Sequence, residues 1–158
     1  MRAAQAIATM ISVRTASILD AEDLRLWRND ESTRAASVSR SIVSWADHVR
    51  WFTEVLADDR RRVYISEEKG EKVGMCRFDL SDDDLAAEVS INLNPEFRGR
   101  GLARPVLKES IARFRSDIVR PISLTATIRP SNGASIRLFG SVGFEFAHGD
   151  ELFKHYVG

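Results

Sequence analysis

One stretch, NPEFRGRGLARPVL at residues 94–107, constrains the fold of this chain more than any other. Pro95 has no amide hydrogen to give to a strand ladder, so strand pairing should stop there on one side. Gly99 and Gly101 let the backbone bend sharply and come close to a ligand. Pro105 fits only within the first turn of a helix, because later turns need the donor that it lacks. The stretch therefore predicts the end of a strand, a tight loop and the start of a helix.

The same loop predicts an anion site. The amides of roughly Gly99 to Arg104 lie at the positive end of the expected helix, where no helical carbonyl pairs with them. Such a terminus suits a phosphate or pyrophosphate. Arg98 and Arg100 add positive charge, and Arg98 can also pin the loop. The Gly-Lys-Ser/Thr of a P-loop and the third glycine of the dinucleotide fingerprint are absent, whereas an RNA-binding segment or an ordinary loop stays open for this stretch taken alone.

Hydrophobic spacing divides the rest of the chain into alternating strands and helices, typical of a mixed α/β single domain over residues 11–158 preceded by an extension at 1–10. The expected strands are 11–14, 61–68, 72–80, 86–94, 122–129 and a final pair within 144–157. The expected helices are 21–30, 44–58, 100–115 and 131–144, with a polar loop over 31–40. Asp20 and Ser44 are expected to cap the first two helices, and Trp45, Val49, Phe52 and Leu56 to form the apolar face of the second.

Composition excludes several classes of partner. The 158 residues carry 23 basic and 23 acidic side chains, so no global field favours nucleic acid or an anionic membrane. The apolar residues near the start are too few to span a bilayer, and a single cysteine favours a cytoplasmic setting. That residue, Cys76, is expected to be a buried structural thiol rather than a nucleophile. His148 and His155 have no neighbours at metal-ligand spacing, so no metal is expected.

Two spaced motifs resemble those of the GNAT N-acetyltransferases. The first, Ile91-x-Leu93-x-Pro95-x-x-Arg98-x-x-Gly101-x-Ala103, resembles the family's acyl-CoA motif, Arg/Gln-x-x-Gly-x-Gly/Ala after a strand. The second, Asn132-x-x-Ser135-x-x-Leu138-Phe139-x-x-x-Gly143-Phe144, resembles the next family motif in the expected order. The resemblance implies an α/β (α+β) GNAT domain with a mixed, mostly antiparallel sheet flanked by helices. It also implies a splayed strand pair that binds acyl-CoA.

The resemblance further implies where acetyl-CoA, the expected co-substrate, would lie. Its pantetheine arm would occupy the V between the strands at 86–94 and 122–129, pairing with backbone groups near Leu93. Three side chains would lie beside that arm and the thiol end: Asn132, Ser135 and Phe139. The pyrophosphate would bind the amides of the loop residues Arg98, Gly99, Arg100, Gly101, Leu102 and Ala103.

Catalytic roles follow from the same resemblance, with one departure. The Leu93 amide is the expected oxyanion donor, and Glu88 is the expected base, acting directly or through water; a solvated strand carboxylate is the other interpretation of Glu88. Most relatives carry tyrosine where this chain has Phe139, and a phenyl ring cannot donate a proton. Core packing and contact with the CoA arm are expected for Phe139 instead. The thiolate then leaves unaided or takes its proton from water or from a hydroxyl of Ser135, Tyr156 or Tyr64.

The N-terminal half hints at the acceptor. LRLWRNDESTR and SIVSWADHVRWF resemble a GNAT branch that acetylates nucleotide-linked amino sugars, although ribosomal-protein and other small-molecule acetyltransferases share this layout. Arg28 would bind a phosphate, and His48 would bond a hydroxyl or move a proton; a satisfied, partly buried histidine is the other interpretation. We expect direct acetyl transfer to a small-molecule amine without nucleic acid or membrane partners. A protein N-terminal amine, a non-catalytic acyl-CoA-binding module and a homodimer stay open.

Overall fold

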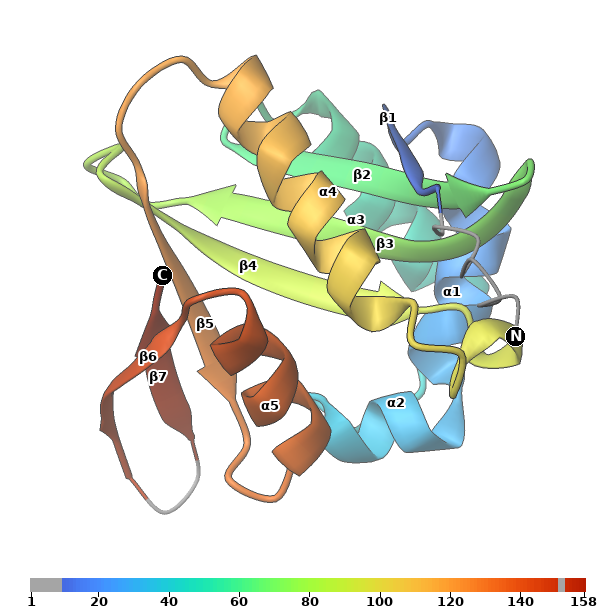
Figure 1. The fold of residues 1–158 in the computed structure, drawn as a ribbon. Helices are drawn as coiled ribbons and strands as arrows, with labels where there is room; N and C mark the ends of the chain where they lie inside the picture. The colour runs from blue at the N-terminus through green and yellow to red at the C-terminus, as the bar shows by residue number, and fades with distance from the viewer. Residues whose placement is uncertain (1–9, 151–152) are drawn as a thin grey trace, which may run out of the picture.

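The computed structural model describes residues 10–150 and 153–158 and centres on a seven-stranded sheet (Figure 1). The strand order is β1-β2-β3-β4-β5-β7-β6, and every neighbouring pair is antiparallel except β4 and β5. The strands are β1 (Ser12–Thr15), β2 (Arg61–Glu68), β3 (Glu71–Leu80), β4 (Ala86–Leu93), β5 (Ser123–Ile128), β6 (Glu145–Gly149) and β7 (Lys154–Val157). The predicted mixed, mostly antiparallel sheet is confirmed. Residues 1–9 of the expected extension lie outside the described residues.

Helices cover both faces of the sheet. Helix α4 crosses one face, α1 and α3 lie on the other, and α2 and α5 lie toward the end at which β4 and β5 diverge (Figure 1). The helices are α1 (Ala21–Asn29), α2 (Glu31–Ala36), α3 (Trp45–Ala57), α4 (Ala103–Asp117) and α5 (Gly133–Ser141), with 3-10 turns η1 (Ile18–Asp20) and η2 (Pro95–Phe97). Within the described residues, no helix is both long and apolar enough to cross a membrane.

Two apolar cores hold these layers together. The core under α4 and α5 includes Phe78 and Phe114, whose stacked rings lie 4.3 Å apart between centroids. The core under α1 and α3 includes Trp27, Phe52 and Ile65. Because alternate residues of a strand point to opposite faces, β2 and β3 supply side chains to both cores.

The expected polar loop over 31–40 is partly wrong, because residues 31–36 form α2. The Asp30 carboxylate accepts a hydrogen bond from the Thr33 amide at 3.2 Å and so caps this short helix. Apolar periodicity gave no sign of it, since α2 has no buried residue. Its first turn is instead held by a capping carboxylate in the preceding residue.

The buried face of α3 also differs from the predicted one. Ser44 caps the helix as expected, accepting a hydrogen bond from the Asp47 amide, but Trp45 is 50 % exposed. The buried positions are His48, Phe52 and Val55. This set has the same four-and-three spacing as an all-apolar stripe, and it includes a histidine that the pattern treated as polar.

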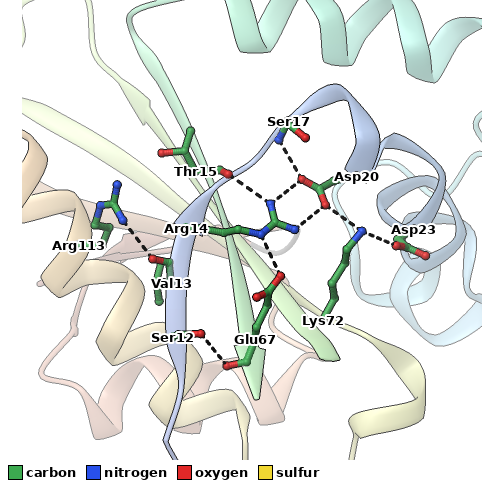
Figure 2. A network of polar contacts seen from close by, with 10 residues as sticks. All are labelled: Ser12, Val13, Arg14, Thr15, Ser17, Asp20, Asp23, Glu67, Lys72 and Arg113. Atoms are coloured by element: carbon green, nitrogen blue, oxygen red, sulfur yellow. Dashed lines mark hydrogen bonds and ion pairs between the residues drawn. The ribbon is translucent and has the colours of Figure 1, made fainter. Parts of the chain in front are cut away.

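Asp20 begins α1 as predicted, but its carboxylate does not cap that helix. The side chain is 2 % exposed and accepts two hydrogen bonds from Arg14, at 2.9 and 2.8 Å, and one from the Ser17 amide. Lys72 lies 2.9 Å away and also bonds Asp23 (Figure 2). Burial alone would raise the pKa of Asp20, but these hydrogen bonds hold it well below its usual range. The carboxylate thus fastens β1 and the start of β3 to α1.

Candidate active site

The central feature of the site is a gap in the sheet between β4 and β5. Their parallel ladder covers only three residue pairs and ends where Glu88 faces Thr125. Strand β4 continues along β3 as far as Leu93, whereas β5 continues along β7, so the two strands diverge (Figure 1). Past Glu88 the β5-facing edge of β4 therefore has backbone groups without strand partners.

A cavity of about 850 Å³ lies at this gap. Its wall includes β4 from Val89 to Leu93, β5 from Ala126 to Ile128, and residues of α1, α2, α3 and α5. A volume of this size matches that of small-molecule sites, which commonly measure about 300–1,000 Å³. The cavity reaches from the glycine loop before α4 to the aromatic side chains of α3.

The loop before α4 has the geometry that its sequence predicts. Asn94 bonds the Glu96 amide and so starts the turn η2, and Gly99 and Gly101 adopt φ angles of +73° and +72°. Only glycine takes up this left-handed region without strain. Pro105 lies in the first turn of α4, whose leading amides have no intrahelical partner. These amides form a positive terminus beside the gap, since Gly99 and Ala103 line the cavity.

Arg98 ties this loop to α2. Its guanidinium donates to the Asp30 carboxylate at 2.7 Å and to the Thr33 hydroxyl at 2.5 Å. The Arg98 hydrogen bond holds the pKa of Asp30 below its usual value. Thr33 in turn lies 3.3 Å from the amide oxygen of Asn92 on β4. Arg98 therefore pins the loop, as its position suggested, and it also lines the cavity.

The other two loop side chains point elsewhere. Arg100 is exposed, with its guanidinium 4.8 Å from the centroid of the Phe97 ring. Leu102 is 4 % exposed and belongs to the core under α4. Neither is among the residues that line the cavity.

Helix α5 supplies the opposite wall. Asn132 caps it by accepting a hydrogen bond from the Ser135 amide at 3.2 Å, and both residues line the cavity together with Phe139. Phe139 is 3 % exposed and packs edge-to-face on Phe144, with ring centroids 5.0 Å apart. Its ring is thus part of the core and of the cavity wall.

The candidate proton donors separate clearly. Ser135 lines the cavity, but Tyr64 and Tyr156 are not among the lining residues. Tyr64 is buried and donates to Asp117 at 2.8 Å, and burial raises its pKa. Cys76 is fully buried, and burial raises the pKa of its thiol to about 12, so it is neither accessible nor ionised at neutral pH.

Both expected acceptor-side residues lie in the cavity wall. Arg28 donates through Nη2 to the Ser39 carbonyl at 2.7 Å, whereas its buried Nη1 has no partner among the described residues. His48 is 3 % exposed and lies against the rings of Trp51 and Phe52. Burial lowers its pKa, and a hydrogen bond with the Ala21 backbone opposes that shift. Its Nε2 finds no partner in the described part of the chain.

Glu88 and Leu93, the two expected catalytic positions, are placed differently. Leu93 lines the cavity at the free end of β4. Glu88 is exposed and is not a lining residue, although Ser90 and Asn92, on the same face of the strand, are. Each two-residue step along a strand covers about 7 Å, so Glu88 lies one such step from the nearest lining side chain on its face.

Thr33, Trp51, Arg77 and Arg129 are among the lining residues that were not predicted. Arg77 interrupts the apolar strand KVGMCRFDL, and that was a usable signal. Thr33 lies in the segment expected to be a loop, and Trp51 lies outside the apolar face predicted for its helix. Among the described residues, no group of three or more His, Cys, Asp or Glu side chains could hold a metal.

Comparisons with known proteins agree with this geometry. A family model described as an acetyltransferase (GNAT) domain matches residues 11–145. A spermidine N-acetyltransferase from Vibrio cholerae, solved with CoA and spermine, superposes with a TM-score of 0.82 at 15% identity over 94% of both chains. An aminoglycoside acetyltransferase solved with coenzyme A gives 0.79 at 19% identity, again over 94% of both chains.

A third solved structure is more similar in sequence. The ribosomal-protein-alanine N-acetyltransferase from Brucella melitensis gives a TM-score of 0.77 at 26% identity, over 93% of this chain and 98% of that one. A search among curated proteins finds no match. The neighbours share a fold, and their names refer to three different kinds of amine.

Proposed function

This chain belongs to the acetyltransferase (GNAT) domain family, and from that premise we propose that it transfers the acetyl group of acetyl-CoA directly to a primary amine. The observation that carries the proposal is the gap between β4 and β5, where a free strand edge and the glycine loop that leads into α4 line one cavity. An extended chain with an amide backbone and a pyrophosphate end would fit these two features. Two of the structural neighbours were solved with CoA.

The proposed placement of acetyl-CoA uses residues on three sides of the cavity. The amides of the loop from Arg98 to Ala103 would hold the pyrophosphate, and the free edge near Leu93 would pair with the pantetheine arm. Asn132, Ser135 and Phe139 on α5 would contact the arm and the thiol end. The fit is supported by the positive φ angles of Gly99 and Gly101, which leave the amides uncovered by a Cβ atom.

Acetyl-CoA supplies a thioester carbonyl, and the residues of the chain handle charge and protons around it. The neutral amine forms the new N–C bond while the C–S bond breaks. The Leu93 amide would donate to the oxygen on which negative charge develops. We assign Glu88 the role of a base that removes the amine proton through water, because its side chain does not reach the cavity wall. Such proton transfer contributes about 10²–10⁴-fold to a rate.

The departing thiolate needs a proton that Phe139 cannot give. Ser135 is the one hydroxyl among the three considered that lines the cavity, so we propose that it, or water, supplies that proton. Cys76 takes no part, because its buried thiol rules out an acetylated enzyme at that position.

For the acceptor we propose a primary amine on a nucleotide-linked amino sugar. The support is the pair formed by Arg28 and His48, which line the same cavity and carry polar atoms, Nη1 and Nε2, without partners in the described chain. A protein N-terminal amine is the second candidate, favoured by the 26% identity to a ribosomal-protein-alanine N-acetyltransferase. An acyl-CoA-binding module without turnover is the third.

Thiol release from acetyl-CoA tests these alternatives. We expect release with a nucleotide-linked amino sugar and none with peptides that begin with alanine; the reverse result would select the protein acceptor. CoA binding should be measured on the same preparation by calorimetry. Binding without release on a broad panel of amines would favour the non-catalytic module, and failure to bind CoA would refute the cavity assignment altogether.

A further inference from the structure

The wall of the large cavity has a one-sided charge. Four arginines line it, namely Arg28, Arg77, Arg98 and Arg129, and none of the described lining residues is an aspartate or glutamate. The whole chain has equal numbers of acidic and basic residues, so this asymmetry is local. A cleft lined by one sign of charge raises the local concentration of ligands of the opposite sign.

Two of these arginines form ion pairs with carboxylates that do not line the cavity. Arg98 pairs with Asp30 at 2.7 Å, and Arg77 pairs with Asp79 at 2.9 Å. The Arg77 guanidinium also lies 5.4 Å from the centroid of the Trp51 ring. The positive charges of Arg77 and Arg98 are therefore largely offset by these two carboxylates.

The other two are held only by neutral groups. Arg129 donates to the carbonyls of Ser37 and Val38 at 2.6 and 2.7 Å, and Arg28 donates to the Ser39 carbonyl. For neither does the described part of the chain provide a carboxylate within ion-pair distance. A carbonyl fixes the orientation of a guanidinium but carries no charge to offset it. The segment after α2 thus orients two cations that no carboxylate of the described residues compensates.

Arg28 is the more exceptional of the two. It is partly buried, and the buried Nη1 has no partner in the described chain, which is costly for a charged donor. Burial lowers its pKa, and the charges of Arg34 and Arg77 act in the same direction. Its surroundings are therefore positive as well as poorly solvated, and an anion at Nη1 would relieve both costs.

The smaller cavity shows that this chain does not treat all clustered arginines in this way. That cavity, of about 470 Å³, is lined by Arg60, Arg62 and Arg120 together with carboxylates. There Asp84 lies 3.3 Å from Arg60 and 3.6 Å from Arg120. Two of the three arginines of the smaller cavity, Arg60 and Arg120, thus contact a carboxylate that lines the same cavity, whereas the described residues give Arg28 no such partner.

We propose that the acceptor carries a phosphate or carboxylate in addition to its amine, and that Arg28 binds this anionic group through Nη1, with Arg129 adding to the attraction. The proposal rests on the proposed function and sharpens it: the acceptor is an anionic amine, and polycationic amines are poor ligands. It also distinguishes this chain from the structural neighbours whose names refer to spermidine and aminoglycosides.

Binding to the CoA-saturated protein tests the proposal without requiring turnover. Calorimetry would compare two matched pairs, glucosamine 6-phosphate against glucosamine and alanine against alanine amide. In at least one pair we expect the member that carries the phosphate or carboxylate to bind about tenfold or more tightly than the member that lacks it, and spermidine to bind more weakly than either. The pair that responds identifies the anion as phosphate or carboxylate. Binding of CoA itself, measured first, tests the proposed function separately.

Variants decide whether Arg28 is responsible. Arg28→Gln should abolish the advantage of the anionic ligand, whereas Arg28→Lys, which keeps the charge, should retain part of it. Arg50→Gln is the matched control, because Arg50 lies on the exposed side of α3 and pairs with Asp47; it should change nothing. Three results would each overturn the proposal: equal affinity for the members with and without the anionic group, no binding of either ligand that carries that group, or tighter binding of those ligands that survives in folded Arg28→Gln.

Discussion

Replacing Asp20 by asparagine removes one negative charge from a buried carboxylate that three separate segments share. Arg14 of β1, the Ser17 amide and Lys72 of β3 all converge on it (Figure 2). Asparagine has the same shape, so packing is kept, but it presents an NH₂ group to donors. Arg14 and Lys72 each lose one of the two carboxylates that they contact and keep the other, Glu67 and Asp23 respectively. Removing one partner of a fully buried ion pair costs about 3–5 kcal/mol.

The expected cost here is smaller, because the cations can turn to water. The side chain of Asp20 is 2% exposed, but those of Arg14 and Lys72 are 40% and 29% exposed. We therefore expect Asp20→Asn to lower the free energy of unfolding by about 2–3 kcal/mol. For a domain of this length that corresponds to a fall in Tm of about 4–12 °C. Urea unfolding at pH 7, followed by tryptophan fluorescence, would measure it.

The pH dependence gives a second, independent reading. Because folding depresses the pKa of Asp20, its contribution is fully present above the ordinary carboxyl pKa of 3.8 and is lost as the pH falls toward the folded value. The difference between wild type and Asp20→Asn should therefore narrow by about 1 kcal/mol between pH 7 and pH 3. Asp23→Asn is the control, since Asp23 is 45% exposed and Lys72 is its one ion-pair partner within residues 10–150 and 153–158; it should cost less than about 1 kcal/mol. Two results would refute this account of the network: a decrease in the free energy of unfolding below 1 kcal/mol for Asp20→Asn, or a difference between wild type and variant that does not change with pH.

Two further predictions concern the cavity. Gly101→Glu should weaken CoA binding about 100-fold or more by calorimetry, because its carboxylate would repel the phosphates of CoA at the loop before α4. Gly70→Glu is the control: Gly70 has a similar φ of +80° in the β2–β3 turn, so this change should cost comparable stability and leave CoA affinity unchanged. Unaltered affinity in Gly101→Glu would remove the loop from the site. Glu88→Gln should lower kcat/KM for the amine about 10²-fold or more and abolish the acidic limb of the pH–rate profile without changing CoA affinity, if Glu88 is the base. A pH–rate profile of Glu88→Gln that matches that of the wild type would exclude Glu88 as the base.

Local patterns predicted most of the elements that build the site. The turn before α4 could be anticipated because glycine and proline restrict the backbone of their own residues, so their effect does not depend on the rest of the fold. The β2–β3 hairpin is similar: its turn places Lys69 and Gly70 at positive φ between two alternating strands. Where a residue type limits its own conformation, one sequence is enough.

The failures have a common physical origin in contacts between distant residues. The helix at 31–36 has no buried side chain of its own, and its Asp30 cap is held by Arg98 from a loop 68 residues away. His48 is buried because α3 turns it toward the sheet, which helical spacing alone could not distinguish from the stripe through Trp45. The uncompensated charge of Arg28 likewise depends on which carboxylates lie nearby in space.

The gap beside β4 has a consequence for how the backbone exchanges hydrogen with solvent. Alternate amides of a strand face opposite neighbours, so past Glu88 those that face β3 are held in a ladder while those that face the gap are not. This gives β4 one slow-exchanging and one fast-exchanging edge within the same few residues. An unpaired edge at the rim of a sheet invites another protein strand to add to it. Here the edge lies inside the sheet, flanked by β5 and α5. Its free backbone N–H and C=O groups are therefore accessible only to a chain narrow enough to enter the cavity.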